Sequence, residues 1–166
     1  MVVKRDAGLF SGLGLGFLGQ FLGQRLNELV LADCQRRGFP EMRVSHGYVI
    51  QHLVDHDGPV SRTGSELARR MGVTQQAASK VVGELLRLGV LEVEQAPDRR
   101  AKCVRLSARG WSGVKYARQS RSRLEDKLAR HLGRQRYEET RDALRVCLEL
   151  VGGTGRIRSR RVRQSE

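Results

Sequence analysis

Cysteine, proline and aromatic residues are scarce in this chain of 166 residues, which has three cysteines, three prolines and one tryptophan. The cysteines, Cys34, Cys103 and Cys147, are odd in number and far apart, and they form no C-x-x-C pair. This pattern argues against a disulfide framework or a zinc site and is typical of reduced thiols in a cytoplasmic protein. The remainder is rich in leucine, alanine, arginine and glutamate, so we expect a mainly α fold.

Acidic residues are also outnumbered, because 18 Asp plus Glu stand against 31 Lys plus Arg, a formal net charge of +13. Such a basic chain, of a length that suits one domain, favours a polyanionic partner, nucleic acid first and an anionic membrane surface second. Solubility alone, or a genome that favours arginine codons, would produce the same balance. Only the placement of the charges along the chain can therefore distinguish a polyanionic partner from these alternatives.

No segment has the roughly 20 strongly apolar residues that a membrane span needs. The nearest is GLGLGFLGQFLG at 12–23, which is diluted by glycines and glutamines. It follows a basic start, as the apolar part of a secretory signal would, but a small-x-small cleavage site is missing. We therefore expect an amphipathic helix in a cytoplasmic protein, with no membrane partner.

The same stretch contains Gly14-x-Gly16-x-x-Gly19, the spacing of a dinucleotide-binding turn. Such a turn needs a preceding strand, and the residues before it contain no alternating or β-branched run long enough to form one. Six glycines between Gly8 and Gly23 make the stretch a poor helix on its own. We expect it to fray at its start and to be ordered mainly by a partner subunit.

The middle of the chain has the pattern of several short helices. After a break at Gly38 and Pro40, residues 41–54 have mixed helical spacing and predict a helix that ends before the turn DHDGP. Thr63-Gly64-Ser65-Glu66 is a capping box that starts the next helix. The turn Gly72-Val73 and the N-cap Thr74 then predict another helix over QQAASKVVGELLRL.

This last helix has two distinct faces. An apolar stripe facing a core is predicted for Ala77, Val81 and Leu85, with Ala78, Val82 and Leu88 alongside. Two compact helices joined by a glycine-containing turn, the second with a polar outer face, form a helix-turn-helix. Glutamine suits adenine edges, while serine and lysine suit phosphates or guanine. The predicted DNA-reading residues are Thr74, Gln75, Gln76, Ser79 and Lys80; a merely solvated polar face is the alternative.

A two-stranded hairpin is predicted directly after this helix. Gly89 caps the helix, VLEVEQ alternates as a strand, APDRRA turns, and KCVRLS alternates back. The tip is basic, with Arg99, Arg100 and Lys102. Because a narrow minor groove attracts arginine, this hairpin indicates a wing that enters the groove beside the recognition helix.

Residues 64–110 resemble the MarR family of bacterial winged-helix regulators. The resemblance rests on the LA…GVT helix-turn-helix, the D-x-R wing and the V-x-L-[ST]-x-x-G ending, with serine where threonine is commoner. More loosely it extends over about residues 13–151. It implies that Asp98 orients Arg100, and that Arg100 reaches into the minor groove. It also implies a homodimer on a palindromic DNA operator, most often a repressor released by a small aromatic or anionic effector.

The flanking helices have more apolar surface than one small winged domain can cover, which fits the dimer that the resemblance implies. We therefore divide the chain into an N-terminal dimerisation helix (1–38), a winged helix-turn-helix DNA-binding domain (39–110), C-terminal dimerisation helices (111–151) and a disordered basic tail (152–166). The tail combines glycines with arginines and cannot fold alone. It would add nonspecific phosphate contacts.

Other chemistry has weaker support. Cys34 and Cys147 are candidates for redox sensing, but small buried residues are the simpler interpretation. His52 and His56 stand four residues apart beside two aspartates, yet a third metal ligand at a definite spacing is missing, so we expect no metal site. Nothing resembles a nucleophile–base pair or a paired-carboxylate site, and we expect no enzyme and no cofactor. An architectural protein that coats DNA without sequence choice remains an alternative.

Overall fold

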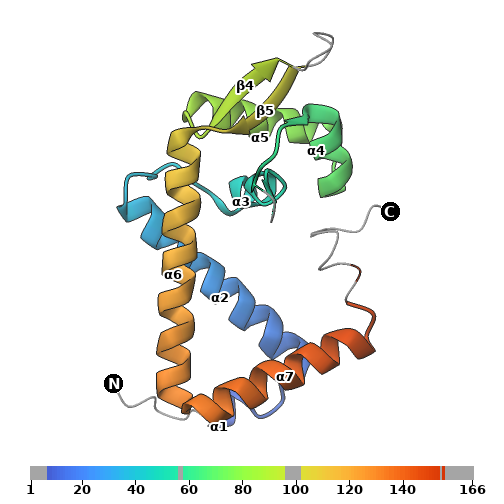
Figure 1. Ribbon diagram of the computed structural model, residues 1–166. Helices are drawn as coiled ribbons and strands as arrows, with labels where there is room; N and C mark the ends of the chain where they lie inside the picture. Colours follow the sequence, from blue (N-terminus) through green and yellow to red (C-terminus); the bar gives the residue numbers. More distant parts are fainter. Residues whose placement is uncertain (1–6, 56–57, 96–101, 154, 156–166) are drawn as a thin grey trace.

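The computed structural model describes residues 7–55, 58–95, 102–153 and 155. Figure 1 shows a winged part at one end of the molecule and three long helices that extend from it as a triangular frame. The helices are α1 (Ala7–Phe10), α2 (Leu15–Arg36), α3 (Val44–Ile50), α4 (Gly64–Met71), α5 (Gln75–Arg87), α6 (Ala108–Leu132) and α7 (Arg134–Leu150). The strands are β1 (Val54–Asp55), β2 (Gly58–Pro59), β3 (Arg62–Thr63), β4 (Leu91–Gln95) and β5 (Lys102–Leu106).

The hydrophobic core lies in the winged part, where α3, α4 and α5 meet the strands. Its fully buried apolar side chains include Val49, Leu53, Leu67 and Leu85. Helix α5 directs Ala78, Val82 and Leu85 into this core, as its periodicity predicts. Ala77, expected in the same stripe, is exposed, because the buried face centres on those three residues and Ala77 lies at its edge.

The strands form two small antiparallel sheets. In the larger one β5 lies between β4 and β3, with Val104 opposite Val93 on one side and Arg62 on the other. The hairpin of β4 and β5 was predicted and is confirmed, whereas β3 is too short to show a pattern. The predicted helix over 41–54 is wrong at its end: α3 stops at Ile50 and β1 pairs with β2. Pro59 favours an extended residue before it, which suits a strand there.

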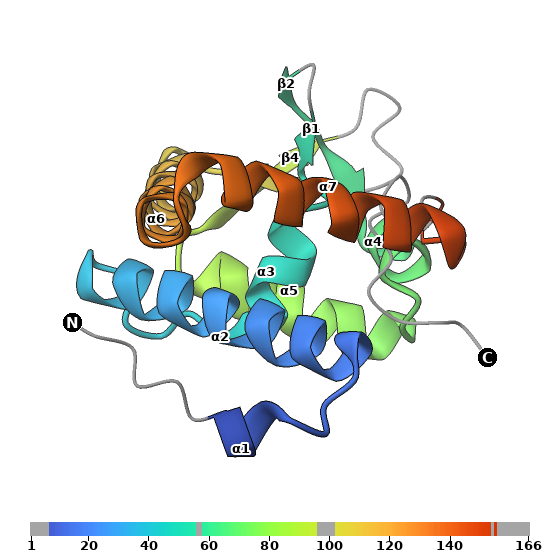
Figure 2. The same cartoon turned by 90° about the horizontal axis from the view of Figure 1, so that it is seen from below.

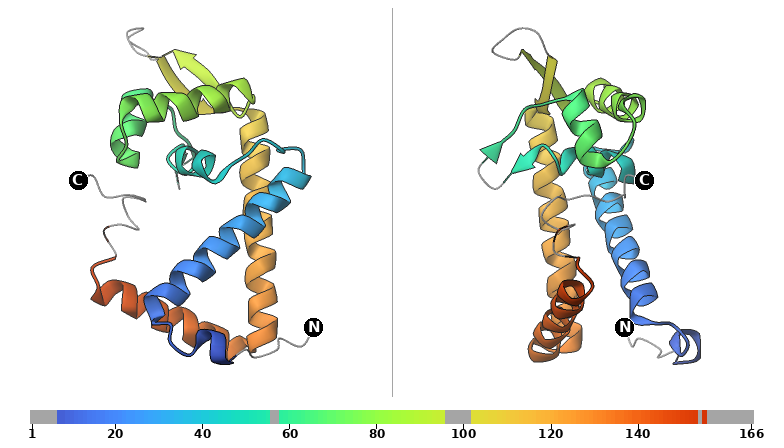
Figure 3. Two further views of the ribbon diagram at one scale, coloured as in Figure 1. Left: turned by 180° about the vertical axis from the view of Figure 1, so that it is seen from behind. Right: turned by 90° about the vertical axis from the view of Figure 1, so that its right-hand side faces the viewer.

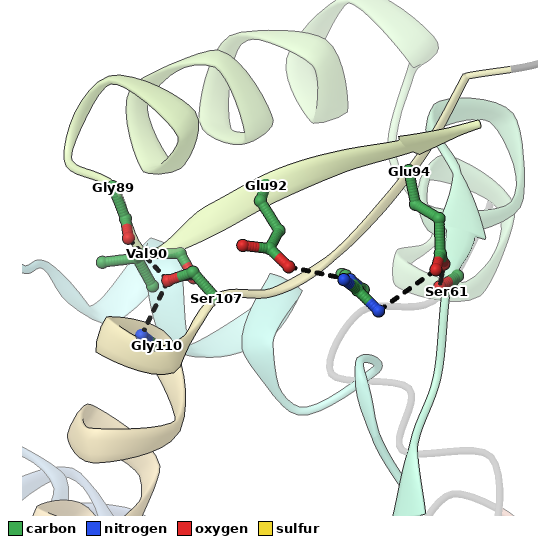
Figure 4. A network of polar contacts seen from close by, with 8 residues as sticks. Ser61, Gly89, Val90, Glu92, Glu94, Ser107 and Gly110 are labelled. Carbon is green, nitrogen blue, oxygen red and sulfur yellow. Dashed lines mark hydrogen bonds and ion pairs between the residues drawn. The ribbon is translucent and has the colours of Figure 1, made fainter.

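The wing and α6 meet at a tight corner, drawn in Figure 4. The Ser107 hydroxyl caps α6 by accepting from the Gly110 N–H at 3.0 Å, and it donates to the Gly89 carbonyl at 2.6 Å. A Cβ on Gly110 would lie 2.2 Å from the Val90 carbonyl oxygen. The serine and the glycine of the V-x-L-S-x-x-G motif are therefore required by the close approach of α6 to β4.

Three long helices make the frame below the winged part. Figure 3 shows α2 and α6 descending together from it, and α7 crossing at their foot. Arg123 in the second half of α6 pairs with Asp33 near the end of α2 at 2.6 Å, which ties these two helices together. The predicted break between α6 and α7 is Gly133, whose φ of 81° favours glycine. Within the described part of the chain, none of the helices has the length and apolar content needed to cross a bilayer.

Candidate nucleic-acid interface

Capping interactions fix the two helices α4 and α5 at either side of their turn. The Thr63 hydroxyl accepts from the Glu66 N–H at 3.2 Å, and the Glu66 carboxylate accepts from the Thr63 N–H at 2.9 Å. That second bond, above all, lowers the pKa of the Glu66 carboxyl. Gly72 ends α4 with a φ of 67°, and the Thr74 hydroxyl caps α5 by accepting from the Ala77 N–H at 3.2 Å. The capping box, the turn and the N-cap are all confirmed.

The predicted DNA-reading residues lie together on the outer face of α5. Helix α5 is held at the end of the molecule opposite α7 (Figure 1). Its buried residues form the opposite face, so the polar groups project away from the core. The exposed residues of this face are Thr74, Gln75, Gln76, Ser79, Lys80, Gly83 and Arg87.

The wing is described along its strands but not at its tip. Lys102 is exposed at the start of β5, where the predicted basic tip joins the strand. Asp98, Arg99 and Arg100 lie outside the described residues. The positions of the tip side chains relative to α5 therefore stay a prediction.

The strands of the wing carry a network of cross-strand ion pairs (Figure 4). Arg105 of β5 binds Glu92 at 2.8 Å and Glu94 at 3.1 Å on β4, and the Ser61 hydroxyl also donates to Glu94. The single positive charge of Arg105 is thus shared between two carboxylates and offsets part of their mutual repulsion. These cross-strand pairs also support the register of the hairpin.

Helix α3 contributes a polar contact to α5 that sequence reasoning missed. His46 is buried, and its Nε2 lies 3.0 Å from Glu84 Oε2. This hydrogen bond is the main cause of a lowered pKa for the Glu84 carboxyl. The sequence gives no signal for it, because the two residues lie 38 positions apart on different helices.

A cavity of about 400 Å³ opens between α2, α3 and α6. Apolar side chains form much of its wall, including Val30, Phe39 and Val114. Three exposed arginines, Arg43, Arg118 and Arg121, also line it. Such a lining suits a compact molecule with an apolar body and an anionic group.

The candidate redox and metal residues differ in how deeply they are buried. Cys34 is buried on α2, and burial, followed by the neighbouring Asp33 carboxylate, raises the pKa of its thiol. That change disfavours the reactive thiolate. Cys147 is half-buried on α7. His52 is buried, while His56 lies outside the described residues; among those described, no three potential ligands form a metal cluster.

The frame leaves apolar side chains exposed mainly along the first half of α2 and at the end of α7. The first half of α2 exposes Phe17 by 60% and Phe21 by 56%, together with Leu15, Leu18 and Leu22. The end of α7 exposes Leu150 by 81% and Val151 by 80%, and none of the residues of α7 is buried. Figure 2, the view from below, shows α7 and the start of α2 in front of the winged part. Surface of this kind commonly marks an interface.

Comparisons with known proteins agree with this geometry. The model of the MarR family matches residues 42–101. No curated protein matches the sequence.

Among solved structures, MepR, a transcription regulator of the Staphylococcus aureus multidrug efflux pump MepA, is similar with a TM-score of 0.68 and 15% identity, over 84% of this chain and 99% of that one. YusO from Bacillus subtilis has a TM-score of 0.59 and 21% identity, over 90% and 99%. The transcriptional repressor CouR, solved on a 23-mer DNA duplex, has a TM-score of 0.60 and 24% identity, over 90% and 99%.

The matched segment spans α3, the helix-turn-helix and the first strand of the wing. The matches to solved structures extend beyond this segment, over 84–90% of the chain, and MepR and CouR are a transcription regulator and a transcriptional repressor, respectively. Residues 42–101 thus match the MarR family model, and the chain shares the winged-helix fold of its solved neighbours, which include the transcription regulator MepR and the transcriptional repressor CouR.

Proposed function

We propose that this protein is a cytoplasmic homodimer that binds a palindromic operator in double-stranded DNA and represses transcription until an effector releases it. The observation that supports DNA reading most directly is the outer face of α5. There, short hydrogen-bonding side chains project from a helix whose opposite face is anchored in the core. Gln75 and Gln76 suit adenine edges, and Lys80 suits a phosphate or guanine.

The wing supplies the second contact. Asp98 orients Arg100 in the minor groove, with Arg99 and Lys102 beside it on the phosphates. The net charge of +13 favours the same partner. The basic tail at 152–166 adds contacts that carry no sequence information.

The exposed apolar residues of α2 and α7 support the homodimer. Residues 1–38 and 111–151 form its interface in this proposal, and 39–110 is the DNA-binding unit. The glycines of α2 help here, because a side chain at Gly16, Gly19 or Gly23 would meet open space within one protomer. A second copy can therefore approach this helix closely. Two recognition helices about one DNA turn apart then read the two halves of a palindrome.

The cavity between α2, α3 and α6 is the proposed effector site. Its apolar wall and its three arginines favour a small aromatic anion, for which benzoate is a simple probe. The cavity lies where the proposed dimer helices meet the winged domain, so an occupant contacts both units.

Footprinting on the DNA that flanks its own gene tests the proposal, and we expect protection of a palindrome. Arg100→Ala should weaken binding about 10-fold to 100-fold. Arg136→Ala removes the same charge from an exposed site on α7 and is the matched control, expected to bind within about twofold. Equal losses in the two variants would contradict the role of the wing.

The high positive charge also favours a second candidate, an architectural protein that binds DNA without sequence choice. Competition between the protected fragment and random DNA at one salt concentration separates the two functions. A regulator should prefer its operator about a thousandfold or more, whereas an architectural protein shows no such ratio.

A further inference from the structure

A buried histidine joins α3 to the recognition helix. The His46 side chain has 1% of its surface exposed. Its Nδ1 accepts a hydrogen bond from the Arg43 backbone N–H at 3.2 Å, so in the neutral ring the proton is on Nε2. Nε2 lies 3.0 Å from Glu84 Oε2 and donates to that carboxylate. Both nitrogens of the ring thus have a defined partner, one on its own helix and one on α5.

Glu84 lies on the side of α5 that carries a predicted DNA contact. Lys80 precedes it by four residues, and the two charges attract each other. In a helix, side chains at this spacing are neighbours. A Glu84 carboxylate that is not held by α3 would therefore compete with DNA for the Lys80 ammonium group.

Two other contacts tie the same segments together, but they are weaker. Arg43 Nη1 lies 3.6 Å from Glu84 Oε2, and Arg87 Nη2 lies 3.6 Å from Glu41 Oε2. Both arginines are more than half exposed, so solvent screens these pairs. The His46 bond differs, because its donor is shielded from water and its acceptor is charged.

We propose that His46 is a positioning residue for DNA recognition, because it holds the Glu84 carboxylate against α3. This contact fixes the position of the recognition helix relative to α3 and keeps Lys80 available for DNA. The inference rests on the proposed function, since it concerns the same DNA-reading face. His46 itself touches no DNA in this proposal. It acts through Glu84 alone.

Four substitutions in the full chain test this role in matched pairs. His46→Asn keeps an acceptor near the Arg43 N–H but is too short to reach Glu84, whereas His46→Gln places an amide donor near the former Nε2. Glu84→Ala removes the acceptor from the opposite end, and Glu84→Gln retains one. The Glu84 side chain is partly exposed, at 20% against 1% for His46, so the Glu84 variants still test the proposal if a change at His46 prevents folding.

Binding to the footprinted operator is the first measurement. His46→Asn should lose about tenfold in affinity, the amount expected for one hydrogen bond to a charged group, and His46→Gln should recover most of it. Glu84→Ala should lose less than His46→Asn, because it also removes a negative charge near DNA, and Glu84→Gln should bind within about twofold of wild type. Equal affinities for His46→Asn and His46→Gln, or for Glu84→Ala and Glu84→Gln, would overturn the proposal.

Amide exchange of α5 without DNA separates this inference from the proposed function. Faster amide exchange of α5 in His46→Asn than in His46→Gln supports the role of His46 in holding α5 against α3, and identical exchange in the two variants refutes that role. If wild-type protein bound operator and random DNA equally, the regulator function would fail, while the exchange comparison would still decide the role of His46.

Discussion

Replacing Gly110 with alanine should destabilise the protein by about 3 kcal/mol, the upper end of the range for overpacking. The added Cβ would lie 2.2 Å from the Val90 carbonyl oxygen and 2.9 Å from Leu106 Cδ2. The carbonyl has little freedom to withdraw, because it accepts hydrogen bonds from the Ser107 backbone and hydroxyl at 3.1 Å each. Relief therefore requires α6 to move away from β4, which would open the corner between the wing and the frame.

Urea unfolding at one protein concentration measures this change. Gly83→Ala is the matched control, because the same methyl group would meet open space on the exposed face of α5. It should stabilise the protein by about 0.5–1 kcal/mol, the helix-propensity difference between the two residues. The reasoning would be refuted if Gly110→Ala were as stable as wild type, or if both variants shifted stability in the same direction.

Three further predictions concern pH, assembly and local order. The pKa of the Glu66 carboxyl lies below its ordinary value of 4.5 mainly because of the Thr63 N–H, so its stabilisation is complete above that pH and is lost as the pH falls below it; Glu66→Gln should flatten the acid-unfolding curve followed by circular dichroism. Leu18→Glu should shift the protein to monomers in sedimentation experiments, whereas Gln76→Glu, which adds the same charge at an exposed site outside the proposed interface, should leave the dimer intact. Residues 8–16 should exchange amide hydrogens faster than α5, and equally slow exchange would contradict the expected fraying.

Much of the site was predictable from sequence because its signals are local. The capping residues Thr63 and Thr74 act within their own first turns, and Gly72 ends a helix through its own φ angle. The two faces of α5 follow from its 3.6-residue period. Alternation likewise predicted the β4–β5 hairpin, since each strand is long enough to show it.

Other features depend on contacts between distant segments. The end of α3 at Ile50, the pairing of β1 with β2 and the addition of β3 to β5 involve strands of two residues, which show no period. The bond between His46 and Glu84 joins residues 38 positions apart. The cavity likewise takes its walls from three helices that only the fold brings together.

The sequence by itself determined the helix-turn-helix, the wing strands and the surplus apolar helices at both ends, because each is specified by neighbours along the chain. Only the tertiary structure decided why Gly110 has to be glycine, how Arg105 bridges Glu92 and Glu94, and which residue holds α5 against α3. Those properties depend on distances in space between different helices and strands, and the spacing of residues along the chain does not give those distances.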